Sequence, residues 1–198
     1  MSFTLIESKL VNVYSRFTDL IFSKGGTITA ANSSYLADGA SACLLTTESK
    51  AKQLDLKPKA YLRHYAYAAQ DPRNELMLGM AYSISRVLAR SGLKLSDFDV
   101  IELYEGSAGQ VLSNMRALSS DKFCSEKLGL GEAVGVVDEG RLNLWGGSVS
   151  LGHPFGATGI RLLSHAADRL RHEDGRLALV AAGAANAQGA AMVLERYP

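Results

Sequence analysis

The sequence predicts an α/β fold in which amphipathic helices cover a layered sheet. From Lys24 onward, short apolar runs alternate with longer stretches whose apolar residues recur at helical spacing. The chain has 198 residues, of which 47% are hydrophobic, and this is enough to bury a sizeable core in one or two domains. The longest apolar runs are short and are interrupted by glycine or polar residues, so we expect no membrane span.

Six short segments have the composition of strands. They are rich in small, β-branched or aromatic residues and are bounded by turn residues. The predicted strands are Thr27–Ala30, Gly39–Thr46, Ala60–Tyr67, Val100–Leu103, Leu177–Ala182 and Gly189–Glu195. The second and the last resemble each other, because both follow a turn-rich stretch and begin with small residues. This similarity is either chance in an alanine-rich sequence or a sign of two copies of one sheet topology. In the second case, nearly all of the first copy is missing from this sequence.

Four segments are predicted to be helical: Glu48–Leu54, Asp71–Gly92, Ser107–Leu118 and about Phe155–His172. Asp71 can cap free backbone N–H groups, Pro72 fits the first turn, and Gly92 provides a stop. The apolar residues expected to face the core recur every three or four positions. In the last three helices they are Met77, Met80, Ile84, Val87 and Leu88, then Val111, Leu112, Met115 and Leu118, and then Ile160, Leu163, Ala167 and Leu170.

The first 24 residues carry a roughly helical apolar stripe. We expect a helix that packs on the domain or binds a partner. The alternative is a matrix-targeting presequence, which should be rich in arginine and poor in acidic residues. This segment has a single arginine, Arg16, and is interrupted by Glu7 and Asp19.

Charge and cysteine content narrow the classes of function. The chain has 21 Lys and Arg against 20 Asp and Glu, so the formal net charge of +1 predicts no nucleic-acid binding through a basic patch. Cys43 and Cys124 could form at most one disulfide and make no CxxC pair. We therefore expect no disulfide scaffold, no metal site and no cofactor.

The segment from Asn143 to Gly159 contains five glycines in 17 residues and ends where a helix begins. His153 lies just before that helix, where the positive end of the helix dipole disfavours an imidazolium. A neutral imidazole there can accept a proton or donate a hydrogen bond to a developing oxyanion. The alternative is that Gly-His-Pro forms only a tight turn.

This segment, Asn-x-x-Gly-Gly-x-x-x-x-Gly-His-Pro-x-Gly-x-x-Gly, resembles the active-site signature of the thiolase family. Three further stretches are similar to that family: 26–34 followed by Asp38-Gly39-Ala40, 103–110, and 188–198. In particular, the chain resembles the β-subunit of the fatty-acid oxidation trifunctional complex. The resemblance covers about residues 24–198. It implies a thiolase-like layered sheet and helices, made of the C-terminal half plus the last strands of the N-terminal half.

The resemblance also implies a domain division and a location. Residues 1–24 would be an N-terminal extension, 25–55 a remnant of the thiolase N-terminal half, and 56–198 the thiolase C-terminal domain. Because the relatives that the chain resembles act in fatty-acid oxidation, we expect a mitochondrial location.

Thiolases cleave 3-ketoacyl-CoA with a nucleophilic cysteine, an Asn or His, the Gly-His-Pro histidine and a second cysteine that moves the substrate proton. By resemblance, His153 is the histidine and Glu105 matches the family's motif glutamate. Tyr104 replaces the Asn or His, Gly183 replaces the second cysteine, and Asn186-Ala187 replaces a Gly-Gly pair. No segment of this sequence matches the part that carries the nucleophile. Cys43 and Cys124 lack the setting that lowers a thiol pKa, so we expect both to be structural or incidental.

Three functions follow as hypotheses. The first is a catalytically inactive subunit of a larger assembly, in which a protein partner covers the surface that the missing thiolase half would cover. In that hypothesis His153 and Glu105 are remnants of the site. The second is one half of a split 3-ketoacyl-CoA thiolase, and the third is an acyl-CoA-binding module. CoA or acyl-CoA would be a ligand only in the last two, and whether the chain is an enzyme stays open at this stage, with the first hypothesis favoured.

Overall fold

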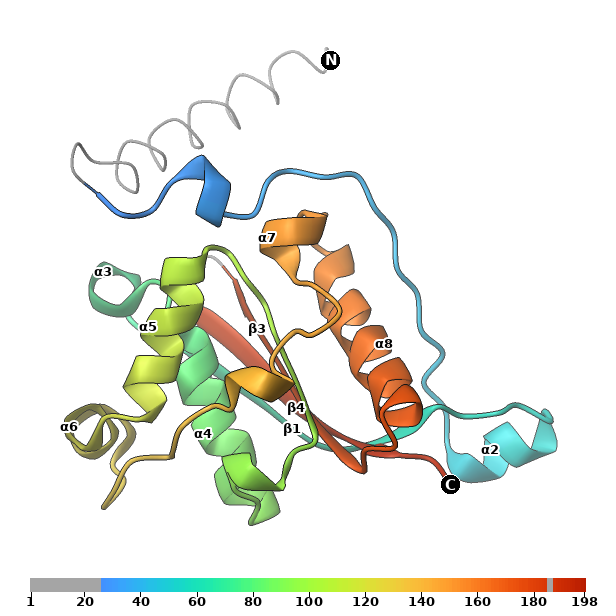
Figure 1. Cartoon of the computed structure of the whole chain (residues 1–198). Coiled ribbons are helices and arrows are strands. Elements are labelled where there is room, and N and C mark those ends of the chain that lie inside the picture. The colour runs from blue at the N-terminus through green and yellow to red at the C-terminus, as the bar shows by residue number, and fades with distance from the viewer. Residues whose placement is uncertain (1–25, 185–186) are drawn as a thin grey trace, which may run out of the picture.

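The computed structural model describes residues 26–184 and 187–198, so the helix expected for residues 1–24 lies outside the described residues. The described chain folds around a four-stranded sheet with helices on both faces (Figure 1). The strands are β1 (Ala60–Ala69), β2 (Val100–Leu103), β3 (Leu177–Ala184) and β4 (Gln188–Arg196). The α/β fold class predicted from the sequence is confirmed.

The strand order in the sheet is β1-β4-β3-β2. β4 runs antiparallel to both β1 and β3, and β2 runs parallel to β3. All four strands match predicted ones. The parallel pair of β2 and β3 places the carboxyl ends of both strands at one edge of the sheet, beside the glycine-rich segment.

Two helices cover one face of the sheet and one covers the other (Figure 1). α4 (Gly79–Ser91) packs on β1, β3 and β4, and α5 (Ala108–Leu118) packs against α4. α8 (Ala157–His172) lies on the opposite face. The shorter helices are α2 (Glu48–Gln53), α3 (Pro72–Glu75), α6 (Asp121–Phe123) and α7 (Ser148–Leu151). A π-helical turn (Cys124–Leu128) and three 3-10 turns (Ala30–Asn32, Leu95–Asp97, Glu139–Arg141) complete the described elements.

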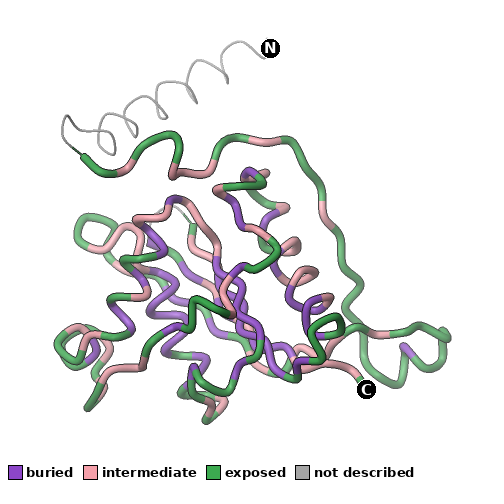
Figure 2. The backbone as a smooth tube through the Cα atoms, in the orientation of Figure 1, coloured by how far each residue is buried: buried purple, intermediate pink, exposed green. Residues whose placement is uncertain are grey.

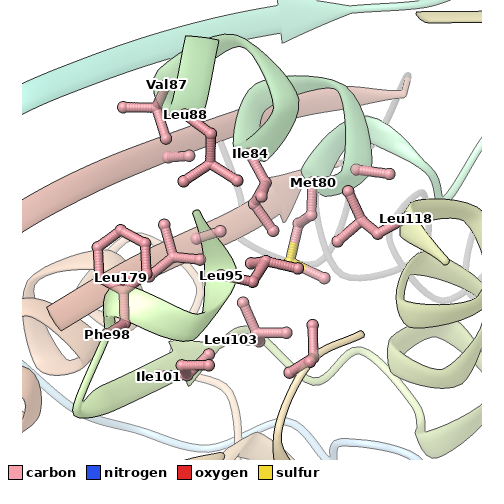
Figure 3. Packing of buried hydrophobic residues seen from close by; sticks show 14 of the residues in the cluster. Met80, Ile84, Val87, Leu88, Leu95, Phe98, Ile101, Leu103, Leu118 and Leu179 are labelled. Atoms are coloured by element: carbon pink, nitrogen blue, oxygen red, sulfur yellow. The ribbon is translucent and has the colours of Figure 1, made fainter. Parts of the chain in front are cut away.

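Two apolar clusters hold these layers together. The larger lies between α4, α5 and the sheet, where Met80, Ile84, Phe98 and Leu179 are fully buried (Figure 3). The smaller lies under α8 and is centred on Leu162 and the strand residues beneath it. No helix in the described part of the chain is long and apolar enough to cross a membrane.

The helix predicted from Asp71 is interrupted. Asp71 caps α3 and Pro72 occupies its first turn, as expected, but the chain turns before α4 begins at Gly79. A β-carbon at Gly79 would lie 2.2 Å from the carbonyl oxygen of Gln188, so the backbone of α4 packs directly on the β3–β4 hairpin. Gly92 ends α4 in the left-handed conformation, as predicted.

The predicted buried face of α5 is partly wrong, because Leu112 is 58% exposed. The buried side of α5 includes Asn114 instead. The Asn114 side chain accepts a hydrogen bond from the backbone N–H of Ala81 and donates one to the carbonyl of Met77. The face of α5 is thus rotated toward the start of α4 by polar contacts that an apolar pattern does not reveal.

Two predicted strands are wrong. Residues 27–30 form a bend that leads into a 3-10 turn, and residues 39–46 are extended and mostly exposed, without a neighbouring strand (Figure 2). A strand needs backbone partners on at least one side, and no described strand lies beside these segments. The chain between them is held by isolated contacts instead, such as the bridge of Ser33 to Ser107, and the Ser41 hydroxyl donates to the carbonyl of Ala157.

Candidate functional site

The glycine-rich segment is anchored to the end of β2 by Asn143. The amide oxygen of Asn143 accepts from the backbone N–H of Leu103 at 2.8 Å, and its NH₂ group donates to the Leu103 carbonyl at 2.9 Å. Asn143 has a positive φ of 47°, a conformation in which asparagine is enriched. These two bonds fix where the chain leaves the sheet edge.

Glu105 holds the same glycine-rich segment through two further hydrogen bonds. Its carboxylate accepts from the side-chain amide of Asn143 at 2.5 Å and from the backbone N–H of Val149, near the start of α7, at 3.0 Å. A β-carbon at Gly147 would lie 2.0 Å from the carboxyl carbon of Glu105, so only glycine allows this approach. The geometry gives Glu105 a positioning role within the loop.

His153 follows the braced loop and lies half-buried just before α8. Its Nδ1 atom is hydrogen-bonded to the Thr158 hydroxyl at 2.7 Å, and its backbone N–H donates to the carbonyl of Tyr35 at 2.9 Å. Burial lowers the pKa of the imidazole, and the nearby charge of Arg161 lowers it further. Burial therefore favours the neutral ring, and the hydrogen bond with Thr158 orients it through Nδ1.

Two aromatic rings flank the imidazole. The centre of the Tyr104 ring lies 4.6 Å from the centre of the His153 ring, and the centre of the Phe155 ring lies 5.0 Å from it. Tyr104 comes directly after β2, and its backbone N–H donates to the carbonyl of Ala181 on β3. The structure thus places Tyr104 beside His153, and the neighbouring Glu105 holds the loop that leads to His153.

Gly183 lies near the carboxyl end of β3, paired with Gly189 across the hairpin. A β-carbon at Gly183 would meet the Met80 side chain at 3.5 Å and the Gln188 carbonyl at 3.6 Å, which are ordinary contact distances. The site thus has room for a side chain that glycine does not supply. Asn186 lies outside the described residues, whereas Ala187 is buried and accepts a hydrogen bond from the backbone N–H of Gln70.

Neither cysteine lies in the glycine-rich segment or in the strand end that carries Tyr104 and Glu105. Cys124 is buried in the π-helical turn, where its Sγ atom contacts the carbonyls of Ala117 and Leu118. Cys43 is exposed in the extended segment. Among residues 26–184 and 187–198, no cluster of three or more His, Cys, Asp or Glu side chains could hold a metal ion.

Comparison with protein families identifies this arrangement. A model described as "Thiolase, C-terminal domain" matches residues 56–196, which is most of the chain. The chain belongs to the thiolase family. A model described as "Thiolase, N-terminal domain" also matches residues 13–49. The glycine-rich segment, His153 and the end of β2 all fall within the matched thiolase C-terminal domain.

Individual thiolases are similar over most of the chain. A probable 3-ketoacyl-CoA thiolase of Caenorhabditis elegans is 54% identical over 172 residues, which are 87% of this chain and 38% of that protein. The mitochondrial trifunctional enzyme subunit beta of Bos taurus is 52% identical over 173 residues, 87% of this chain and 36% of that protein. The structure of human mitochondrial 3-ketoacyl-CoA thiolase in complex with CoA has a TM-score of 0.74 and 29% identity, covering 90% of this chain and 41% of that one. The chain therefore spans well under half the length of these thiolases.

A buried cluster of charged residues between β2 and α8, the helix that follows His153, was not predicted from the sequence. Glu102 on β2 and Arg169 on α8 are both fully buried, and an Arg169 Nη1 atom donates to Glu102 Oε1 at 2.9 Å. Arg169 also donates twice to Glu173, at 2.7 and 3.1 Å, and once to the carbonyl of Arg141. Burial raises the pKa of the Glu102 carboxyl, although Arg169 opposes this. The only sequence signal was a glutamate inside an otherwise apolar predicted strand.

Arg161 and His165 extend this cluster toward His153. Arg161 donates to the hydroxyl of Ser148 at 3.0 Å, and its charge acts on the imidazole of His153. The Nδ1 atom of His165 lies 4.0 Å from Glu102 Oε2. Burial lowers the pKa of His165, and Arg161 lowers it further. Arg161 thus links the glycine-rich segment, through Ser148, to the vicinity of the Glu102–Arg169 pair.

Proposed function

We propose that this chain is a thiolase-like subunit that has lost covalent catalysis and serves as a structural component of a larger assembly. One observation carries the proposal: the aromatic ring of Tyr104 packs on His153 at 4.6 Å, where the thiolase resemblance implies an Asn or His. The phenol of Tyr104 carries neither the amide nor the imidazole that the thiolase resemblance implies beside this histidine.

The cysteine positions support the same function. Thiolysis needs a thiolate that takes the acyl group from carbon and a second group that returns a proton to the leaving enolate. Gly183 has no side chain to carry that proton, and Cys124 is buried in another part of the fold. Within the described residues, His153 is then a base without a nucleophile.

Exposed apolar residues support the assembly part of the proposal. Leu44 and Leu45, in the extended segment, are each 74% exposed, and Phe155 beside the site is 65% exposed. Solvent-facing leucines in an extended segment without a sheet are typical of a surface that another protein covers. The names of the trifunctional enzyme relatives further favour a mitochondrial location for this chain.

The split-thiolase function is the second candidate, because His153 keeps an oriented, neutral imidazole. A partner could contribute a nucleophile, but it could not replace Tyr104 or Gly183, which belong to this chain. An acyl-CoA-binding module has no comparable supporting contact.

A thiolysis assay separates these functions. The tagged chain is purified in its native assembly, and cleavage of a 3-ketoacyl-CoA by CoA is measured for the wild type and for His153→Ala. We expect the two eluates to show the same background rate, with an active full-length thiolase as the positive control. Turnover by the wild type that disappears in His153→Ala, with the same partners bound, would establish the split enzyme and overturn the proposal.

A further inference from the structure

Three polar side chains lie in a row along α8, on the side that faces β2. Arg161, His165 and Arg169 are spaced four residues apart, so they share one face of the helix. Each of them acts on Glu102 of β2. Arg169 donates to Glu102 Oε1, and the His165 Nδ1 atom lies 4.0 Å from Glu102 Oε2. The charge of Arg161 also acts on the Glu102 carboxyl, so the helix and the sheet meet here through polar side chains.

Four polar atoms of this contact are buried without a hydrogen-bonding partner among residues 26–184 and 187–198. They are Glu102 Oε2, His165 Nδ1, and the Nε and Nη1 atoms of Arg161. Glu102 is fully buried. Buried polar groups in folded proteins are almost always satisfied, either by the protein or by ordered water. Four such atoms on three neighbouring side chains therefore indicate that a ligand binds between them.

Arg169 cannot supply the missing hydrogen bonds. Its guanidinium already donates to Glu102 Oε1, to both carboxylate oxygens of Glu173 and to the carbonyl of Arg141. One oxygen of the Glu102 carboxylate is therefore left over, and it points toward His165 rather than toward Arg169.

The gap between Glu102 and His165 has the width that one bridging atom needs. A direct hydrogen bond between nitrogen and oxygen requires about 2.7–3.2 Å, and the two atoms are 4.0 Å apart. Two hydrogen bonds of about 2.8 Å that meet at one water oxygen span about 4–5 Å. The four polar atoms are closed to bulk solvent, so the ligand must be small enough to be enclosed.

The charges around the gap disfavour an ion. A cation would lie beside the guanidinium groups of Arg161 and Arg169, and an anion would meet the carboxylate oxygen of Glu102. A neutral ligand has to donate to that oxygen and accept from a guanidinium N–H. Water does both, and its second hydrogen can be donated to the imidazole of His165.

We propose that an ordered internal water molecule bridges Glu102 Oε2 and His165 Nδ1 and accepts a hydrogen bond from the guanidinium of Arg161. Three hydrogen bonds are the usual number for a buried water. This inference goes beyond the proposed function and does not depend on it, because it concerns the contact between β2 and α8 in the folded chain.

The water connects the sheet to the glycine-rich segment. Arg161 also donates to the Ser148 hydroxyl at 3.0 Å, and its charge acts on the imidazole of His153. A hydrogen-bonded path therefore runs from Glu102 through the water and Arg161 to the loop that precedes His153. Arg161 and the water have a positioning role in this path.

A crystal structure of the full chain, alone or in its native assembly, tests the proposal at a resolution that shows ordered water. We expect one density peak within about 3.2 Å of Glu102 Oε2, His165 Nδ1 and a guanidinium nitrogen of Arg161. His165→Phe replaces the imidazole by an apolar ring and should weaken or remove this peak. His172→Phe is the matched control, because His172 is exposed at the end of the same helix, and it should leave the peak unchanged.

Nuclear magnetic resonance of the wild type tests the site in solution and does not depend on the folding of a variant. The water should give a nuclear Overhauser effect to the ring proton Hε1 of His165, with the sign expected of a water bound for longer than the protein takes to tumble. The exposed His172 is the internal control and should show no effect of that sign.

Several results would overturn the proposal. These are a direct hydrogen bond from Arg161 or His165 to Glu102 Oε2 that closes the gap, the absence of both the density peak and the Overhauser effect, a peak with the coordination distances of a metal ion, or a peak that His165→Phe leaves unchanged. Thiolysis measured on the same preparation reports separately on the proposed function, since activity there would reject catalytic loss and leave the water site unaffected.

Discussion

The chemistry left to His153 is decided by the residues around it. Thr158 holds Nδ1, Tyr104 and Phe155 pack on the ring, and Arg161 opposes a positive charge on it. These contacts keep the imidazole neutral and oriented, which is what a base needs. The same contacts place it beside the phenol ring of Tyr104, where the thiolase resemblance implies an Asn or His.

His153 and His165 should make the folded state sensitive to acid. Both have a pKa below the ordinary value of 6.5, so between their folded and unfolded pKa values the unfolded chain binds more protons. The free energy of unfolding should therefore fall as the pH drops through about 6.5. Urea unfolding at pH 7.5 and 5.5 measures this loss, and His153→Gln and His165→Gln should each reduce it.

His172→Gln serves as the reference for the substitution itself, because His172 is exposed at the end of α8. If both buried-histidine variants lose as much stability between the two pH values as the wild type, neither group is responsible for the acid sensitivity.

The buried pair of Glu102 and Arg169 should show strong coupling. Glu102→Gln leaves the Arg169 charge buried with one carboxylate fewer, and we expect a loss of roughly 3–5 kcal/mol in the free energy of unfolding. Arg169→Met should cost a similar amount. The double variant should recover much of the loss, because both buried charges are then removed. Equilibrium urea unfolding of the four proteins measures the coupling, and strictly additive losses would contradict it.

The candidate site residues come from the spacing of motifs in the sequence, and their catalytic roles stay predictions. The spacing around Gly-His-Pro located His153, and the motif after β2 located Tyr104 and Glu105, all of which lie together in the structure. Arg169 was not predicted because arginines in a helix usually face solvent. Its burial depends on Glu102, a residue 67 positions away, and no local pattern reports such a pairing.

At the scale of elements, prediction succeeded where the partner of each element lies within the chain. β4 pairs with both β1 and β3, and α4 buries its apolar stripe on these three strands, so local pattern and tertiary contact agree. Residues 39–46 have an equally strong strand pattern but lie exposed, because strand formation needs a neighbour that no described segment supplies. Propensity alone does not make a strand.

The N-cap of α5 should contribute measurably to stability. Ser107 is buried, its hydroxyl accepts from the backbone N–H of Gln110 at 3.0 Å, and it also bridges Ser33. Ser107→Ala should lower the free energy of unfolding by about 1 kcal/mol, and Ser107→Asp should restore most of it. Thr47→Ala, at the exposed cap of α2, is the matched control and should leave global unfolding unchanged, since Ala51 is the one buried residue of that helix. Equal losses for the two alanine variants would contradict this assignment.

At the scale of the whole molecule, the described chain has one well-packed side and one side with open apolar surface. α4 and α5 enclose the larger cluster, whereas on the α8 side a hollow of about 200 Å³ is lined by Ile160, Leu163 and small strand residues. The extended segment 39–46 is mostly exposed on the same molecule (Figure 2). The two surfaces have the same cause, because in each the apolar side chains have no neighbouring segment among the described residues to pack against. The folded core can thus be stable while the surface stays prone to association.

The isolated chain should therefore bind a hydrophobic dye while its core remains folded. At low micromolar concentration we expect the fluorescence of 1-anilinonaphthalene-8-sulfonate to rise on mixing, because Leu44, Leu45 and the apolar hollow beside α8 offer apolar surface. The same surface in a molten globule would also bind the dye. The near-ultraviolet circular dichroism of Trp145, the single tryptophan, should distinguish the two by staying native-like.

The double variant Leu44→Ser/Leu45→Ser should lower the dye signal, and Leu112→Ser should not, although Leu112 is also exposed. An isolated leucine on a helix offers too little surface, whereas two adjacent leucines in an extended segment form part of a patch. A monomer that binds no dye and stays soluble on concentration would mean that these surfaces need no partner. The structural role proposed for the chain would then lose its physical basis, because no free energy would be gained by covering them.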